Sequence, residues 1–233
     1  MTIRVTIHQP NYLPWLGYFE KALRTDVFIF FDNVQMPMNK SFVTRNRIKG
    51  SNGPQWLTVP VLKSSETKPI AEAKIADALW HRKHLRTLRT VYQKSPWCDA
   101  VIDRLSPIME SDHTNIADLN CALVKEINSI LGLNGRTFLR ASEMDLVAQG
   151  AESIFEILEK TRATIYLTGQ GTGSQRHLDA DKFSDMGVAI EYMSIEFPEY
   201  AQEKLPFEPR LSIIDALMNI GPEEVVEILK KGR

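Results

Sequence analysis

Short apolar segments alternate with amphipathic segments at both ends of this chain. Segments rich in β-branched and aromatic residues predict five strands, at 3–7, 27–31, 136–140, 164–168 and 188–193. Segments with apolar positions three and four residues apart predict helices at 16–24, 150–161 and 179–186. Because strand–helix–strand alternation favours right-handed crossovers, the pattern predicts an α/β fold with an open, mainly parallel sheet of about five strands.

The middle of the chain departs from this alternation. Residues 42–62 predict a β-hairpin, because alternating segments flank an Asn52-Gly53 pair, which is a strong hairpin signal. Further helices are predicted at 78–94, 97–110, 114–131, 212–219 and 222–231, with Gly221-Pro222 between the last two. We therefore expect a single domain over residues 1–233, in which residues 40–132 form a hairpin and three-helix lobe inserted between the second and third strands.

Composition narrows the class of protein. With 233 residues, 43% of them hydrophobic, the chain is long enough for one full core. It contains no apolar segment of the ~18 residues that a membrane span needs, and its N-terminus lacks the pattern of a secretory signal. Its two cysteines, Cys98 and Cys121, fall in predicted helices without metal-like spacing. These features predict a cytoplasmic protein with no membrane partner.

The first strand ends in a polar and aromatic turn with the sequence His8-Gln9-Pro10-Asn11-Tyr12-Leu13-Pro14-Trp15. In open α/β proteins ligands bind at the carboxyl ends of the strands, so side chains on this turn are candidates for a site. An alternative interpretation is that the prolines stiffen the turn and that Tyr12 and Trp15 fill the core.

A second candidate, Asp32, follows the second predicted strand. Because the first two strands are linked by one helix, they are expected to be neighbours, which would bring Asp32 beside His8. A carboxylate in that position orients a general base, and it also suits a ribose or a magnesium ion. The alternative is that Asp32 caps the following turn.

A glycine-rich loop follows the fourth predicted strand, with the sequence Thr168-Gly169-Gln170-Gly171-Thr172-Gly173-Ser174. Glycines at alternate positions allow backbone amides to approach an anion closely. The loop lacks the lysine and the spacing of a Walker motif, and it is not the dinucleotide-binding fingerprint. It therefore predicts contact with an anion without identifying one.

Charge is distributed unevenly along the chain. Residues 40–94 carry a net charge of +9, whereas the whole chain carries −1. Within this segment Arg45, Arg47 and Lys49 alternate along a predicted strand and so share one face. Such a face predicts a phosphate-bearing or nucleic-acid partner, although a solvated basic surface explains the same pattern.

Other chemistry is not indicated. The sequence has no Gly-x-Ser-x-Gly elbow of an α/β-hydrolase and no His, Cys and acid spacing typical of zinc sites, so no metal site is predicted. His84 lies on the apolar face of a predicted helix, which favours a core or interface histidine.

Several segments resemble the WbqC-like family of bacterial proteins over essentially the whole chain. They are His8–Phe19, Phe31–Gln35, Arg45–Lys49, Trp56–Val61 and Leu211–Asp215. Residues 167–178 differ from the pattern Ser-Gly-x-Ser-x-x-x-Tyr-Leu that is usual in relatives, because the loop here is longer and lacks the tyrosine. The first loop also resembles that of Rossmann-like, nucleotide-binding proteins of the nucleotidylyltransferase and class I synthetase type.

The resemblance implies work on surface polysaccharides or unusual amino sugars, including transfer of an amino-acyl group to a sugar amine. We expect a transferase or ligase that uses an activated acyl, aminoacyl or nucleotide-sugar substrate in glycan or secondary metabolism. Its donor would carry phosphates, as a nucleotide or coenzyme A does; an aminoacyl-tRNA acceptor stem is the less favoured partner. The alternative is a non-enzymatic nucleotide-binding or scaffold subunit of a glycan-modifying complex.

Each candidate residue has a role in this expectation. His8 is the general base and Asp32 orients it, while Gln9, Asn11 and Tyr12 position the substrate. The phosphates are held by two arginines and the glycine-rich loop, namely Arg45, Arg47, Thr168, Gly169, Gly171 and Ser174.

Overall fold

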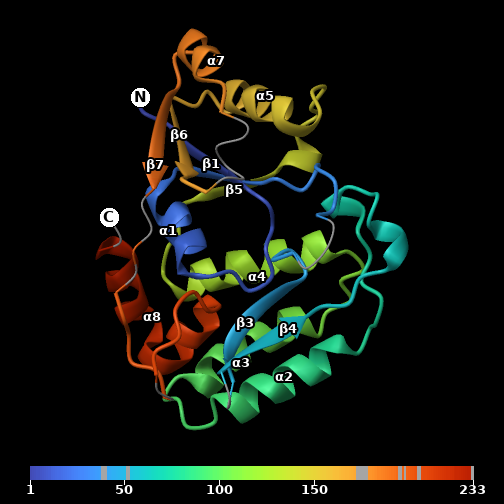
Figure 1. Cartoon of the computed structure of the whole chain (residues 1–233), viewed down its shortest axis with the longest axis vertical. Coiled ribbons are helices and arrows are strands. Elements are labelled where there is room, and N and C mark those ends of the chain that lie inside the picture. Colours follow the sequence, from blue (N-terminus) through green and yellow to red (C-terminus); the bar gives the residue numbers. More distant parts are fainter. Residues whose placement is uncertain are drawn as a thin grey trace.

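A parallel sheet of five strands in the order β5-β2-β1-β6-β7 organises the computed structural model of the chain (Figure 1). The structure describes residues 1–37, 41–50, 53–171, 178–193, 196, 198–203 and 206–231. The strands of the sheet are β1 (Arg4–His8), β2 (Val27–Phe30), β5 (Thr137–Arg140), β6 (Ile165–Gly169) and β7 (Ala189–Met193). All five predicted strands are therefore confirmed, as is the parallel pairing of β1 with both β2 and β6.

Helices cover both faces of the sheet. They are α1 (Leu16–Arg24), α2 (Trp80–Val91), α3 (Cys98–Met109), α4 (Ile116–Ile130), α5 (Ser153–Lys160), α7 (Ala180–Asp185) and α8 (Ile213–Lys231). Figure 1 shows α5 and α7 on one face, with α1, α4 and the remaining helices on the other. Side chains alternate along β2 accordingly: Phe28 and Phe30 join the core with α1 and α4, whereas Ile29 joins the core with α5.

The strand order creates a switch point between β1 and β6. From β1 the chain runs through β2 toward β5, and it later returns to the other side of β1 as β6 and β7. The loops that follow β1 and β6 therefore leave the sheet in different directions and open a crevice at its carboxyl edge, where ligands of open α/β folds bind.

The hairpin and three helices lie between β2 and β5 in the sequence, as predicted. The hairpin strands β3 (Arg45–Gly50) and β4 (Gly53–Thr58) pair in antiparallel fashion. Four short 3₁₀ turns complete the described elements, at Lys63–Ser65, Ile70–Glu72, Ala141–Glu143 and Gly150–Glu152.

Helix α8 contains the break that the sequence predicts. Gly221 has φ 79° and ψ 169°, a conformation that is essentially restricted to glycine, and it separates two helical segments. A β-carbon at Gly221 would lie 2.4 Å from the ring of Trp97, so the break also provides the space in which this ring packs.

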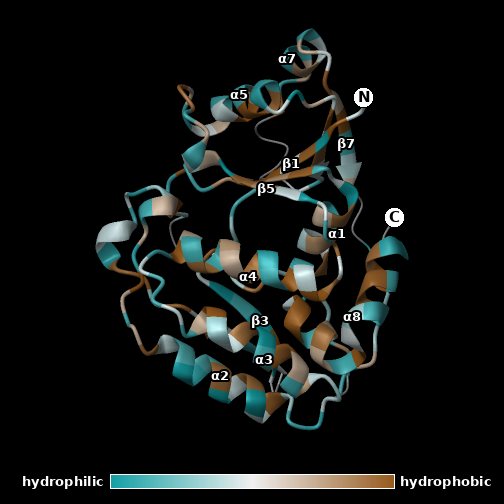
Figure 2. Ribbon diagram, turned by 180° about the vertical axis from the view of Figure 1, so that it is seen from behind, coloured by the Kyte–Doolittle hydropathy of each residue, from teal (hydrophilic) through white to brown (hydrophobic). Residues whose placement is uncertain are grey.

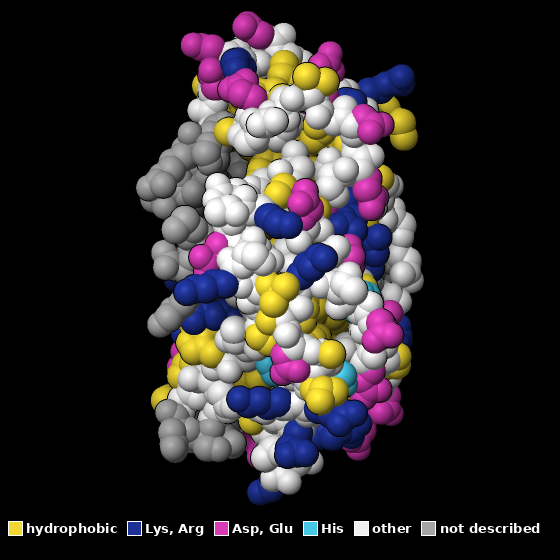
Figure 3. Space-filling model, turned by 90° about the vertical axis from the view of Figure 1, so that its right-hand side faces the viewer, with side chains coloured by type: hydrophobic (Ala, Val, Ile, Leu, Met, Phe, Trp, Pro, Cys, Tyr) yellow, Lys and Arg dark blue, Asp and Glu magenta, His cyan; other side chains and the backbone are white. Residues whose placement is uncertain are grey.

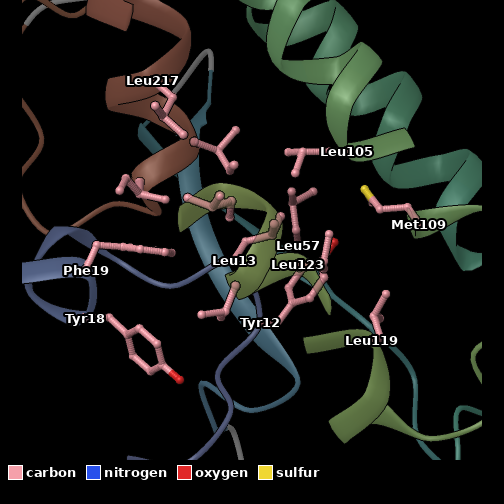
Figure 4. Close-up of a cluster of buried hydrophobic side chains, with 14 of the residues drawn as sticks. Tyr12, Leu13, Tyr18, Phe19, Leu57, Leu105, Met109, Leu119, Leu123 and Leu217 are labelled. Carbon is pink, nitrogen blue, oxygen red and sulfur yellow. The ribbon is translucent and has the colours of Figure 1, made fainter. Parts of the chain in front are cut away.

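The larger core joins the sheet to the inserted lobe. Tyr12, Leu13 and Phe19 from the N-terminal segment pack with Leu57 of the hairpin and with leucines of α3, α4 and α8 (Figure 4). The strands around β1 are hydrophobic and α2 is largely hydrophilic along its outer side (Figure 2). Among the residues that the structure describes, none of the helices combines the length and the apolar character needed to cross a bilayer.

Candidate functional site

The loop after β1 is held by buried polar side chains from three other parts of the chain. Asn120 of α4 donates to the carbonyl of Pro10, with Nδ2 and O 2.8 Å apart. The carbonyl of Leu13 accepts from Asn46 Nδ2 at 2.8 Å and from Ser212 Oγ at 2.7 Å. Because Leu13 has a φ of 40°, which costs a side-chain-bearing residue energy, these bonds are needed to hold the turn. The loop is therefore preorganised without a ligand.

His8 ends β1 with its ring against Tyr18 of α1, the ring centroids 4.8 Å apart. Its Nδ1 lies 3.0 Å from the carbonyl oxygen of Gln9. Since a carbonyl only accepts, Nδ1 carries the hydrogen and Nε2 keeps its lone pair. Burial lowers the pKa of His8 to about 3, and the nearby charge of Lys21 contributes to the shift. His8 is therefore neutral at physiological pH, with one basic nitrogen in a fixed orientation.

A cleft of about 570 Å³ opens beside His8, between α1 and the loop that follows β6. Its floor includes Gly17, and a β-carbon there would lie 2.8 Å from the ring of Trp15. The other wall is formed by Gly169, Gln170 and Gly171. The cleft has the size of a small-molecule site and lies at the switch point of the sheet.

Three cationic side chains line this cleft: Lys21 of α1, Arg47 of β3 and Arg210, which precedes α8. No acidic side chain lines it among the described residues, although Glu208 lies 3.7 Å from Arg47. Burial lowers the pKa of Lys21 to about 8, so it is still mainly protonated at pH 7. On the face shown in Figure 3 the Lys and Arg side chains lie in separate groups with Asp and Glu between them, whereas the described lining of this cleft has three cations and no acidic side chain. The cleft suits an anion.

Asp32 does not orient His8. Its carboxylate is fully buried and accepts from Arg140 Nε at 2.7 Å, Ser142 Oγ at 2.8 Å and the Ser142 amide at 2.9 Å. Arg140 also donates to Asp118 at 2.6 Å. These contacts point toward β5, on the opposite side of β2 from β1, so the hydrogen bonds described for Asp32 do not join it to His8 as the expected pairing requires. The alternative of a structural, turn-capping role describes Asp32 better.

Tyr12 is a core residue and not a substrate contact. Its side chain is fully buried, and its hydroxyl lies 2.8 Å from Nδ1 of His84, which is itself buried. Asn11 and Thr168 are also buried, and neither lines the cleft. The alternative interpretation, in which side chains of this turn fill the core, therefore describes Tyr12.

The other predicted residues lie in different positions relative to the cleft. Arg47, Gly169 and Gly171 line it beside His8, whereas Gln9 lines a second cleft on the other side of His8. Arg45 stacks on Trp56, with its guanidinium carbon 3.9 Å from the ring centroid, and is not among the lining residues. Ser174 lies outside the described residues.

Lys21 and Arg210 were missed at the sequence level. Lys21 lies three and four residues after Tyr18 and Gly17, which also line the cleft, so helical spacing alone places the three on one face. No comparable local signal marks Arg210, which reaches the cleft through the packing of the segment before α8. In the described part of the chain, no group of three His, Cys, Asp or Glu side chains could hold a metal ion.

His8, which is half-buried, and His84, which is buried, predict a pH dependence of stability. Burial lowers the pKa of His8 to about 3 and that of His84 to about 4, against about 6.5 in an unfolded chain. Between these pKa values the unfolded state binds more protons than the folded state. The free energy of unfolding therefore has its full value above pH 6.5 and falls as the pH is lowered below 6.5. Each histidine contributes up to about 1.4 kcal/mol per pH unit. Urea titrations from pH 7 to pH 5 measure this slope, and slopes in His8→Asn and His84→Gln as steep as that of the wild-type protein would contradict the prediction.

Comparison with known proteins places the chain in a family. The model of the WbqC-like protein family matches residues 9–227. The chain is also 33% identical over 223 residues to "Uncharacterized protein Rv1507c" of Mycobacterium tuberculosis, an alignment that covers 94% of this chain and 95% of that protein. No solved structure matches the chain. Since the family match covers nearly the whole chain, including the loop that follows His8 and the segment that carries Arg210, this protein belongs to the WbqC-like family.

Proposed function

We propose that this protein is a group-transfer enzyme, a transferase or ligase whose activated donor carries phosphate groups. The observation that supports this proposal is one cleft at the switch point of the sheet whose lining combines three cations with a neutral histidine held by the Gln9 carbonyl. The cations Lys21, Arg47 and Arg210 would hold the phosphates, and the amides near Gly169 and Gly171 allow a close approach of the backbone.

His8 would act as the general base of the transfer. Its Nε2 takes the proton from the hydroxyl or the neutral amine of the acceptor as that group attacks the activated carbon of the donor. The new bond joins the acceptor oxygen or nitrogen to this carbon, and the leaving group departs with the electron pair. Lys21 and the arginines would stabilise the negative charge that develops on a phosphate-bearing leaving group.

The chemical setting follows from the family resemblance. An activated acyl, aminoacyl or nucleotide-sugar donor in amino-sugar, surface-glycan or secondary-metabolite biosynthesis fits both the resemblance and the cationic cleft. Such donors are made in the cytoplasm, and the free, buried Cys98 and Cys121 are compatible with that compartment.

Anion binding tests the proposal. Pyrophosphate, UDP, ADP and coenzyme A should each be compared by thermal shift and calorimetry, because a ligand of the folded state raises apparent stability. Arg47→Gln is expected to weaken the tightest of these by roughly 1–3 kcal/mol, about 5- to 150-fold. Binding should also weaken above pH 8 as Lys21 loses its proton, and Lys21→Met should remove that dependence.

Arg86→Gln is the matched control, because Arg86 is exposed on α2 and does not line the cleft. It should leave binding of the small ligands unchanged. If Arg47→Gln has no more effect than Arg86→Gln on every ligand, the cleft is not a phosphate site. If Arg47→Gln and Arg86→Gln lose equal affinity for an aminoacyl-tRNA, that result would instead favour an extended surface that binds RNA.

A further inference from the structure

A second cleft of about 490 Å³ lies on the opposite face of the sheet, at the same carboxyl edge. Its lining includes Ile154 of α5 and three side chains from the same core cluster, Ile7, Phe31 and Tyr166. His8 and Gly171 line both this cleft and the cationic one, so the two meet at the end of β1. We call them the apolar arm and the cationic arm of one groove.

The two arms differ in chemistry. Of the described residues that line the apolar arm, none is Asp, Glu, Lys or Arg, whereas the cationic arm has three cations. Among the described residues that line the apolar arm, the polar groups are the His8 and Gln9 side chains, the Tyr166 hydroxyl and the backbone. Burial raises the pKa of Tyr166 to about 12, so it stays uncharged. A charged ligand group would lose its hydration here without gaining an oppositely charged partner among these described side chains.

The size of the apolar arm indicates a separate ligand. Sites for small molecules typically occupy about 300–1,000 Å³, and each arm alone falls in this range. A single phosphate-bearing molecule that fills the cationic arm would therefore leave the apolar arm open. The apolar arm does not continue into the closed core, since Val34 and Ala151 at its rim are partly exposed.

We propose that the apolar arm binds the second substrate of the transfer, an uncharged molecule with an apolar or aromatic body, while the donor occupies the cationic arm. This inference rests on the proposed function. It places His8 between the two substrates, where Nε2 can take the proton of an acceptor in one arm as it attacks a donor in the other. Both substrates are then bound before the chemical step, so the kinetics are sequential.

Two probes test the arms separately. N-phenyl-1-naphthylamine, a neutral fluorescent aromatic molecule, is the probe for the apolar arm, and pyrophosphate is the probe for the cationic arm. Ala151→Trp fills the rim of the apolar arm and is expected to weaken the naphthylamine at least ten-fold, with pyrophosphate affinity unchanged. Lys21→Met should weaken the binding of pyrophosphate and leave the affinity for the naphthylamine unchanged. Saturating pyrophosphate should leave the naphthylamine bound.

Ala100→Trp is the control, since Ala100 is exposed on α3 and lines neither arm. The inference is overturned if Ala151→Trp weakens the naphthylamine no more than Ala100→Trp does, or if pyrophosphate displaces the dye. Should Ala151→Trp unfold, Val34→Trp at the same rim replaces it. Failure of pyrophosphate to bind the wild-type protein would reject the phosphate-donor proposal instead, and the dye result would still decide whether the apolar arm binds a neutral ligand.

Discussion

His8→Asn is expected to lower kcat of the transfer reaction by roughly 10²- to 10⁴-fold, the usual contribution of a positioned general base. Asparagine is of similar size and can still donate to a nearby carbonyl, but it has no basic nitrogen. Because the cations of the cationic arm remain, pyrophosphate affinity should stay within about two-fold of the wild-type value. Turnover is measured with the donor that the binding comparison identifies.

The pH profile distinguishes His8 from an ordinary histidine base. Since burial lowers the pKa of His8 to about 3, its acidic limb should lie well below pH 5, whereas an unperturbed histidine would lose activity near pH 6.5. His84→Gln is a matched control, because His84 is a buried histidine that lines neither arm. Full turnover in His8→Asn would exclude His8 as the base. A binding or scaffold subunit would show ligand affinity and no turnover in the wild-type protein.

Arg140→Met is expected to lower the free energy of unfolding by about 3–5 kcal/mol. Asp32 is fully buried, and the substitution leaves its carboxylate with only the Ser142 bonds to offset the loss of hydration. Arg140 also links this carboxylate to Asp118 on α4, so one side chain ties β2, β5 and the inserted lobe together. Chemical denaturation with both urea and guanidinium measures the change.

Arg104→Met is the comparison variant for this prediction. Arg104 pairs with Glu126 between α3 and α4, but half of its side chain is exposed, so the loss should be about 0–1 kcal/mol. The double variant Asp32→Asn/Arg140→Met should be less destabilised than Arg140→Met, because it removes the buried charge. If Arg140→Met and Arg104→Met lower the free energy of unfolding by the same small amount, Arg140 does not stabilise the buried carboxylate of Asp32.

The fold could be predicted from the sequence because its signals are local and agree with one another. Apolar segments bounded by turns located the five strands, and the Gly221-Pro222 pair located the break in α8. The strands that pair with β1 could be predicted because strand–helix–strand connections favour parallel, neighbouring strands. Positions at the edge of the sheet also followed, which is why the sequence places His8, Gly169 and Gly171 together; these residues line the cleft.

The roles of side chains around the site depend on distant partners and were harder to predict. Asp32 and His8 end adjacent strands, yet Arg140, which is 108 positions away from Asp32, determines the direction of its carboxylate. Tyr12 looked like a ligand contact because no local feature reveals that His84 accepts or donates at its hydroxyl. The order of the strands therefore predicts which residues lie near one another. It does not predict the hydrogen-bond partners, which determine what each polar side chain can do.

The bonds that hold the loop after β1 also determine when the site can form during synthesis. The carbonyl of Leu13 is bound by Ser212, which lies 199 positions later, and the Ile213 amide donates to the Pro14 carbonyl at 2.8 Å. A nascent chain still lacking α8 cannot close this turn, and β1 must wait for β6 before its second edge is paired. Long-range closure of this kind slows folding and leaves strand edges exposed in the meantime. We therefore expect the groove to be among the last parts of the molecule to assemble, only after the C-terminal segment has left the ribosome.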